Sequence, residues 1–229
     1  MSVITKVQAG ANAGTTTVAL SWPNTTTTAG NLLIAAARTN SNFATLSTPS
    51  GWTQVVATTI NTSSRSGYIF AKFSASGGSG DNTTFTASAG AVYINYYEFS
   101  CDIKGIWDVP SSTGSGKDYT MLGANNSSPI TAPSLSSGIT NPSLFFVAGI
   151  TYVSNNLGAI SLTNMPPNGD TTNPTSPIST NYYNGVNTGW GYTTAPASYT
   201  PTYTDNATNN KEIISYVVNF SSGNFFPLL

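Results

Sequence analysis

The chain has 229 residues, of which 7% are charged and 39% are hydrophobic, and its seven basic residues nearly balance its eight acidic ones. The basic residues lie singly along the sequence, so no stripe of positive charge could follow a phosphate backbone, and nucleic-acid binding is not expected. A net charge of −1 leaves little repulsion between copies of the chain and therefore favours assembly.

The first half of the chain is predicted to form short strands separated by polar turns. Residues 3–8 and 15–22 alternate between apolar and polar side chains, as residues 66–74 and 91–99 do further along. Residues 32–37 form an unbroken apolar run, which is typical of a strand buried on both faces. No window carries a convincing helical period with a cap and a stop, so an all-β fold is predicted.

A turn at Pro49-Ser50-Gly51-Trp52 leads into the next predicted strand. Proline fixes φ and lacks an N–H donor, while glycine tolerates a positive φ, so the pair suits a sharp corner. We expect Trp52 to fill the core at one end of a β-sandwich. The functional alternative is a ring that stacks on a sugar.

The second half of the chain is also predicted to form strands separated by polar turns, in a less regular pattern. A stretch rich in small polar residues, 110–128, is predicted to be a linker or an excursion. Strands are predicted near residues 130–135, 143–151 and 211–220. The sequence Asn184-Gly185 supplies the positive φ that a type I′ hairpin turn requires.

Two pairs of segments indicate that the halves are related. Residues 143–151 match residues 32–39 in type, and residues 214–220 match residues 93–99. A period of roughly 110 to 120 residues indicates a duplicated domain rather than a solenoid unit. We therefore predict an antiparallel, jelly-roll-like β-sandwich made of two pseudo-repeat halves, residues 1–109 and 129–229. The pattern leaves open whether the halves form two sandwiches or one body.

Catalytic chemistry finds little support in the sequence. The chain has no histidine, which removes the Ser-His-Asp and Cys-His classes of nucleophilic catalysis, and its single cysteine, Cys101, is expected to be inert. Asp102 and Asp108 could approach one another like the carboxylates of a glycosidase, but we interpret them as turn residues. Asp81 and Asp205 each follow a polar loop and could contribute to a Ca²⁺ site, with a plain Asx-turn as the alternative. We expect a non-enzymatic protein without metal or cofactor.

Two groups of apolar and aromatic residues are candidate contact sites. Trp190 and Tyr192 alternate beside the predicted hairpin, and Tyr182 and Tyr183 lie on its other arm. If exposed, these rings would form a platform for a glycan or a protein, whereas buried rings would be cross-strand pairs. The C-terminal segment carries four large apolar side chains that we expect to dock on their own fold or on a neighbour: Phe225, Phe226, Leu228 and Leu229.

The order of several segments resembles a known family. AGNLLIAAA at residues 29–37, TPSGWTQV at 48–55, GYIFAKF at 67–73 and TTFTASAGAVYINYYEF at 83–99 resemble the β-sandwich modules of tailed-phage and prophage virion proteins. In that family a looser second half opens with a TAPS-like segment, which here is TAPS at residues 131–134. The resemblance implies a sandwich fold and a structural role in the virion, and it brings no catalytic residues.

The resulting hypothesis is a virion structural protein that decorates or cements a phage capsid or sits on the tail, as a homo-oligomer bound to other virion proteins. The first 14 residues lack an apolar stretch of signal-peptide length, so synthesis in a host cytoplasm is expected, with no membrane partner. The alternatives are a glycan-binding attachment module and an extracellular filament subunit whose terminal segment completes a neighbour's sheet.

Overall fold

A computed structural model describes the strands and their packing. The description covers residues 3–41, 44–60, 65–102, 105–108, 119–124, 129–132, 134–137, 142–151, 161–166, 168–169, 186–195, 197–204 and 211–222. Every strand pair in this part of the chain is antiparallel, and its one helical turn is a 3₁₀ turn at Ser79–Asp81. The predicted all-β antiparallel fold is confirmed.

The first large sheet is built around the apolar run at residues 32–37. This run lies within β3 (Leu32–Thr39), which is buried along its whole length. The strand order is β1 (Ile4–Gly14), β7 (Val92–Cys101), β3, β5 (Arg65–Lys72) and β4 (Thr53–Ile60). All five strands come from the first half of the chain.

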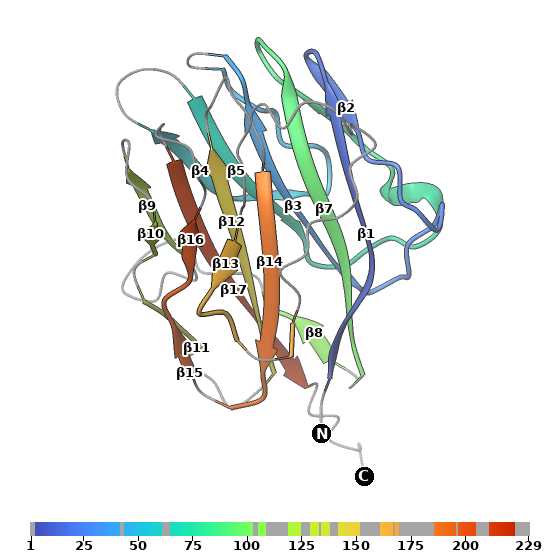
Figure 1. Ribbon diagram of the computed structural model, residues 1–229. Helices are drawn as coiled ribbons and strands as arrows, with labels where there is room; N and C mark the ends of the chain where they lie inside the picture. Colours follow the sequence, from blue (N-terminus) through green and yellow to red (C-terminus); the bar gives the residue numbers. More distant parts are fainter. Residues whose placement is uncertain are drawn as a thin grey trace.

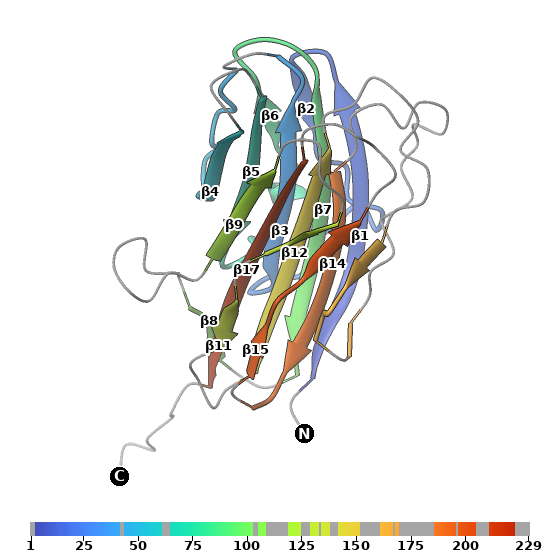
Figure 2. The same ribbon diagram turned by 60° about the vertical axis from the view of Figure 1, so that its left-hand side comes forward.

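The second large sheet is built almost wholly from the other half of the chain. Its order is β14 (Val186–Thr193), β12 (Ser143–Thr151), β17 (Lys211–Ser222) and β8 (Gly105–Trp107), and β9 (Tyr119–Ala124) also pairs with β17. The two sheets lie face to face, as Figures 1 and 2 show. The chain thus forms a β-sandwich with one sheet from each half.

A single apolar core joins the two sheets, which answers whether the halves bury separate interiors. One cluster of apolar side chains contains residues from both sheets. The first sheet contributes residues 32, 34 and 36 of β3 and residues 97 and 99 of β7. The second contributes residues 144, 146 and 148 of β12 and residues 214, 216, 218 and 220 of β17. Alternation with a period of two sends every second side chain of each strand into this layer. The two large sheets therefore bury their inner faces in one shared core.

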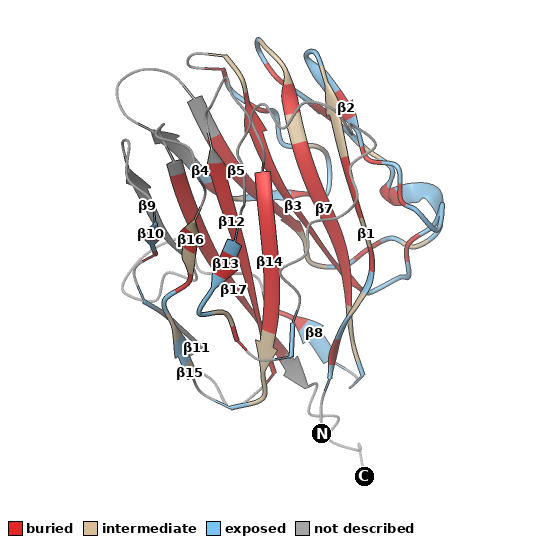
Figure 3. Cartoon of the chain, in the orientation of Figure 1, coloured by how far each residue is buried: buried red, intermediate tan, exposed pale blue. Residues whose placement is uncertain are grey.

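Smaller sheets cover the outer faces, which is why the central strands are buried on both sides (Figure 3). The pair β2 (Thr17–Ala19) and β6 (Thr84–Thr86) packs with neighbouring loops on the outer face of the first sheet. The second sheet is overlaid by β10 (Ile130–Thr131), β16 (Thr202–Thr204) and β13 (Ser161–Thr163), and by β11 (Leu135–Ser137) with β15 (Ala197–Tyr199).

The two large sheets have corresponding central strands. β7 lies between β1 and β3 in the first sheet, and β17 lies between β8 and β12 in the second. Ile34 faces Tyr97 across the first pair, and Leu144 faces Val218 across the second. These partners all contribute to the shared core. The correspondence is consistent with the predicted duplication, and the jelly-roll connectivity stays a prediction.

Within the predicted linker or excursion at 110–128, residues 119–124 form a strand that the sequence reading did not predict, β9, which pairs with residues 211–216 of β17. The segment Tyr-Thr-Met-Leu-Gly-Ala carries enough large apolar residues for a strand, but the surrounding small polar residues concealed it. Since β8 pairs with residues 220–222 on the same antiparallel strand, β8 and β9 are two pieces of one interrupted edge.

Candidate functional site

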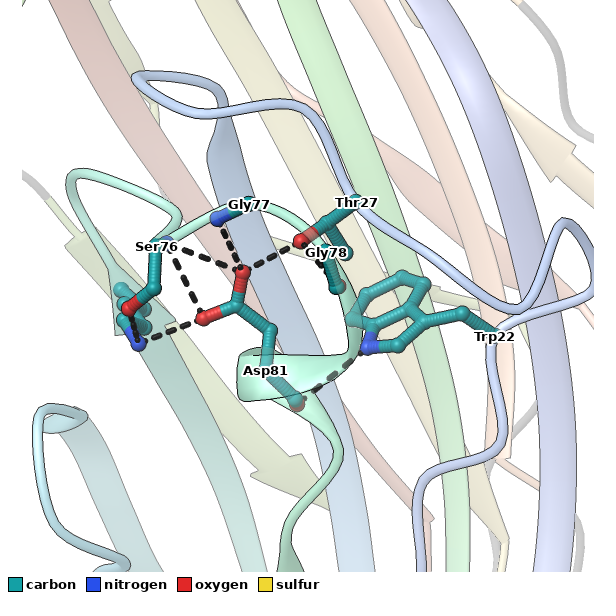
Figure 4. A network of polar contacts seen from close by, with 7 residues as sticks. Trp22, Thr27, Ser76, Gly77, Gly78 and Asp81 are labelled. Carbon is teal, nitrogen blue, oxygen red and sulfur yellow. Dashed lines mark hydrogen bonds and ion pairs between the residues drawn. The ribbon is translucent and has the colours of Figure 1, made fainter.

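A network of polar contacts surrounds the buried carboxylate of Asp81 (Figure 4). Asp81 is the last residue of the 3₁₀ turn after β5, and it is 1% exposed. Lys72 Nζ lies 2.5 Å from Oδ1, and the backbone N–H groups of Ser76 and Gly77 donate to Oδ2 at 2.9 and 3.2 Å. The Thr27 hydroxyl also donates to Oδ2 (Figure 4). Four donors thus converge on one carboxylate.

Opposing effects act on the pKa of Asp81. Burial raises the pKa, but hydrogen bonds from Lys72, Thr27 and Ser76 and the positive charge of Lys72 together outweigh burial and hold it below its ordinary value. The carboxylate is therefore ionised at neutral pH. Its ion pair with Lys72 sits at the edge of solvent, with the Lys72 side chain 13% exposed.

A second buried carboxylate belongs to Glu98 on β7, which is fully buried. Gln8 Nε2 of β1 donates to Oε2 at 2.5 Å, while the Thr28 backbone N–H and Asn31 Nδ2 donate to Oε1 at 2.7 and 2.6 Å. The Gln8 amide is held in turn, because its Oε1 accepts from the Asn24 N–H at 2.9 Å. Neutral donors from β1 and from the following loop therefore surround this carboxylate.

Both carboxylates bind the same loop, residues 22–31, which we call the strap. Thr27 contacts Asp81 and its neighbour Thr28 contacts Glu98. Thr27 also exchanges two backbone hydrogen bonds of 3.0 Å with Gly78. Between positions 23 and 30 only Thr27 is buried. Trp22 anchors the start of the strap in the outer core, and residues 23–30 are attached mainly by polar contacts.

The backbone of the strap contains one unusual conformation. Thr25 has a φ of 61°, in the left-handed region that a β-branched residue rarely adopts. Its N–H donates to the Trp22 carbonyl at 2.8 Å, which closes the turn. Such a conformation persists only where surrounding contacts hold it. The contacts of Thr27 and Thr28 with the two carboxylates lie two and three residues further along the strap.

Large exposed apolar side chains occur near the start of β1 and in β8. Among the described residues the large hydrophobic side chains classed as exposed are those of Val3 (37%), Val7 (38%) and Ile106 (68%). Val3 exchanges hydrogen bonds with Asp102, just beyond the end of β7, and Ile106 lies four residues further along the chain in β8. In Figures 1 and 2, β8 and the beginning of β1 lie toward the same end of the sandwich, in different sheets. We call these three residues the apolar end.

The edges of the two large sheets are interrupted or buried. β1 contains an extra residue at Val7 relative to β7, and β4 contains one at Val55 relative to β5. The second sheet has the interrupted edge of β8 and β9 on one side, and on the other β14 is buried from residue 186 to residue 191. Bulges and covered edges oppose the pairing of a strand with another chain.

The predicted aromatic platform is only partly described. Trp190 is buried in the shared core, where its ring meets Phe99 edge-to-face at 5.2 Å between centroids, and Tyr192 packs partly buried against the same core. These two residues share a face, as expected, but that face points inward. Trp190 therefore does not present its ring to a glycan, and of the two alternatives the buried one applies to it. Tyr182 and Tyr183 lie outside the described residues.

The structure also places Trp52 and the aspartates that the sequence singled out. Trp52 is buried in the outer core, with its ring 5.6 Å from that of Phe85, and Gly51 has the positive φ expected of the turn (78°). The Asp81 carboxylate, one of the two Ca²⁺ candidates, pairs with the Lys72 ammonium, and Asp205 is outside the described residues. Asp102 accepts a hydrogen bond of 2.8 Å from the Val3 N–H at a strand end.

The sequence reading missed the strap and the apolar end. The sequence did contain a signal for the strap. Glu98 is the one charged residue in the apolar and aromatic strand YINYYEF, and a carboxylate in such a strand needs hydrogen-bond donors from another part of the chain. The apolar tail residues, Phe225, Phe226, Leu228 and Leu229, lie outside the described part of the chain. Within that part no cluster of three or more metal-ligating residues occurs, and no helix has the length and apolarity of a membrane span.

Comparison of the chain with models of protein families, with curated proteins and with solved structures gives no significant match.

Proposed function

We propose that the chain is a non-enzymatic structural protein of a virus particle, a capsid decoration or cement protein or a tail-associated protein, that acts by binding other proteins. The observation that carries the assembly role is the apolar end, where Ile106 is 68% exposed on an edge strand. The resemblance of residues 29–37 and 83–99 to phage virion modules supplies the setting.

The position of the apolar end supports a protein contact. A large apolar side chain as exposed as that of Ile106 is suited to a place in an interaction surface. Ser222, the last described residue of β17, pairs with Gly105 of β8. We include in the proposed contact the apolar residues of the C-terminal segment, which follows Ser222 in the sequence: Phe225, Phe226, Leu228 and Leu229.

The polar groups support a structural role rather than catalysis. Asp81 and Glu98 are buried carboxylates that each accept several hydrogen bonds, and both bind the protein's own strap. Each hydrogen bond to an ionised group contributes about 1.5–3 kcal/mol, so these contacts are suited to holding a loop in place. The interrupted sheet edges favour contact through the end of the sandwich over strand addition, which argues against the filament alternative.

Quantitative mass spectrometry of purified particles from cells that make the protein tests the proposal. We expect the chain in a fixed ratio to the major shell or tail protein. Ile106→Asp should lower incorporation at least about tenfold, which corresponds to about 1.4 kcal/mol of lost binding, because an aspartate would be buried without a partner. Thr84→Asp adds the same charge at an exposed position of β6 and should leave incorporation unchanged.

Two outcomes contradict the proposal at different levels. Particles without a stoichiometric copy of the chain would remove the virion role. Normal incorporation of a folded Ile106→Asp variant would leave the virion role intact and remove the apolar end as the contact. Circular dichroism of both variants establishes that the sandwich is folded before the comparison is made.

A further inference from the structure

We draw no further inference here: the strongest candidate, the surface patch on the outer side of the first sheet where β2 and β6 expose Thr17, Thr84 and Thr86, carries nothing because nothing in the structure shows what covers it.

Discussion

Asn95 donates a hydrogen bond of 2.8 Å from its side-chain amide to the backbone carbonyl of Val186, and so links the central strand β7 of one sheet to the edge strand β14 of the other. The same amide also hydrogen-bonds the hydroxyl oxygen of Thr188 at 3.1 Å, and the Tyr97 hydroxyl forms a hydrogen bond with that same Thr188 hydroxyl. This buried polar link fixes how the two sheets face one another inside an otherwise apolar layer.

Replacing Asn95 tests the link. Asn95→Ala should lower the free energy of unfolding by about 1–3 kcal/mol, because the Val186 carbonyl and the Thr188 hydroxyl lose a buried donor. Urea denaturation measures the change. Asn12→Ala is the control, since Asn12 donates to the Ala19 carbonyl at the surface, and we expect a change within about 0.5 kcal/mol. Equal costs for the two variants would contradict the assigned role of Asn95.

The ion pair of Lys72 with Asp81 should depend on pH in a defined direction. Lys72→Met leaves a buried carboxylate without its charged partner, and we expect about 3 kcal/mol of lost stability at pH 7. The folded-state pKa of Asp81 lies below its ordinary value, so this stabilisation is present above the unfolded pKa and is lost as the pH falls through the folded value.

The difference in unfolding free energy between Lys72→Met and the natural chain should therefore shrink as the pH falls below about 4. Denaturant titrations at pH 7 and near pH 3 measure it. A difference that is equal at both pH values would show that the methionine acts by packing alone, and it would contradict the ion-pair account.

Replacing Thr25 by glycine should stabilise the protein. Its φ of 61° disfavours a β-branched side chain, and glycine adopts that conformation without a steric cost, so Thr25→Gly should stabilise the protein by about 1 kcal/mol. Gly51→Ala is the reverse test, because Gly51 has a φ of 78°, and a similar loss is expected. Thermal unfolding monitored by circular dichroism measures both. A destabilised Thr25→Gly would show that the Thr25 side chain contributes more than its strain costs.

Gly10 should not tolerate a methyl group. A Cβ at this position would lie 2.5 Å from the Tyr96 hydroxyl oxygen, which is pinned by its own hydrogen bond of 2.7 Å to the Ser21 carbonyl. Gly10→Ala should cost about 1–3 kcal/mol from the displaced ring. Gly80→Ala is the control, since the nearest atom to its Cβ would be the Ser76 Cβ at 3.7 Å, and its effect on urea denaturation should be small.

Trp190 should behave as a core residue. Trp190→Ala is expected to cost about 3–5 kcal/mol because it opens a cavity between the sheets, against Phe99. Trp190→Phe should cost clearly less, since the buried Nε1–H has no hydrogen-bond partner among the described residues and its removal carries no lost bond. If Trp190→Ala kept full stability in chemical denaturation, the ring would have to be at the surface after all.

The sequence alone gave the strands and the corners, because these depend on neighbours along the chain. The apolar run at 32–37 could only be buried on both faces, Gly51 and Pro49 could only form a corner, and the absence of a helical period excluded long helices. Strand β9 was missed because the small polar residues around it are typical of a linker.

The tertiary structure alone decided which side chains meet. Trp190 and Tyr192 were correctly placed on one face, but alternation is the same for an inward and an outward face, and only the packing of one sheet on the other selects between them. Thr27 and Thr28 look like any polar loop until Asp81 and Glu98, 54 and 70 residues away, come into reach. Local periodicity thus determined the strands, whereas long-range contacts determined the shared core, the strap and the apolar end.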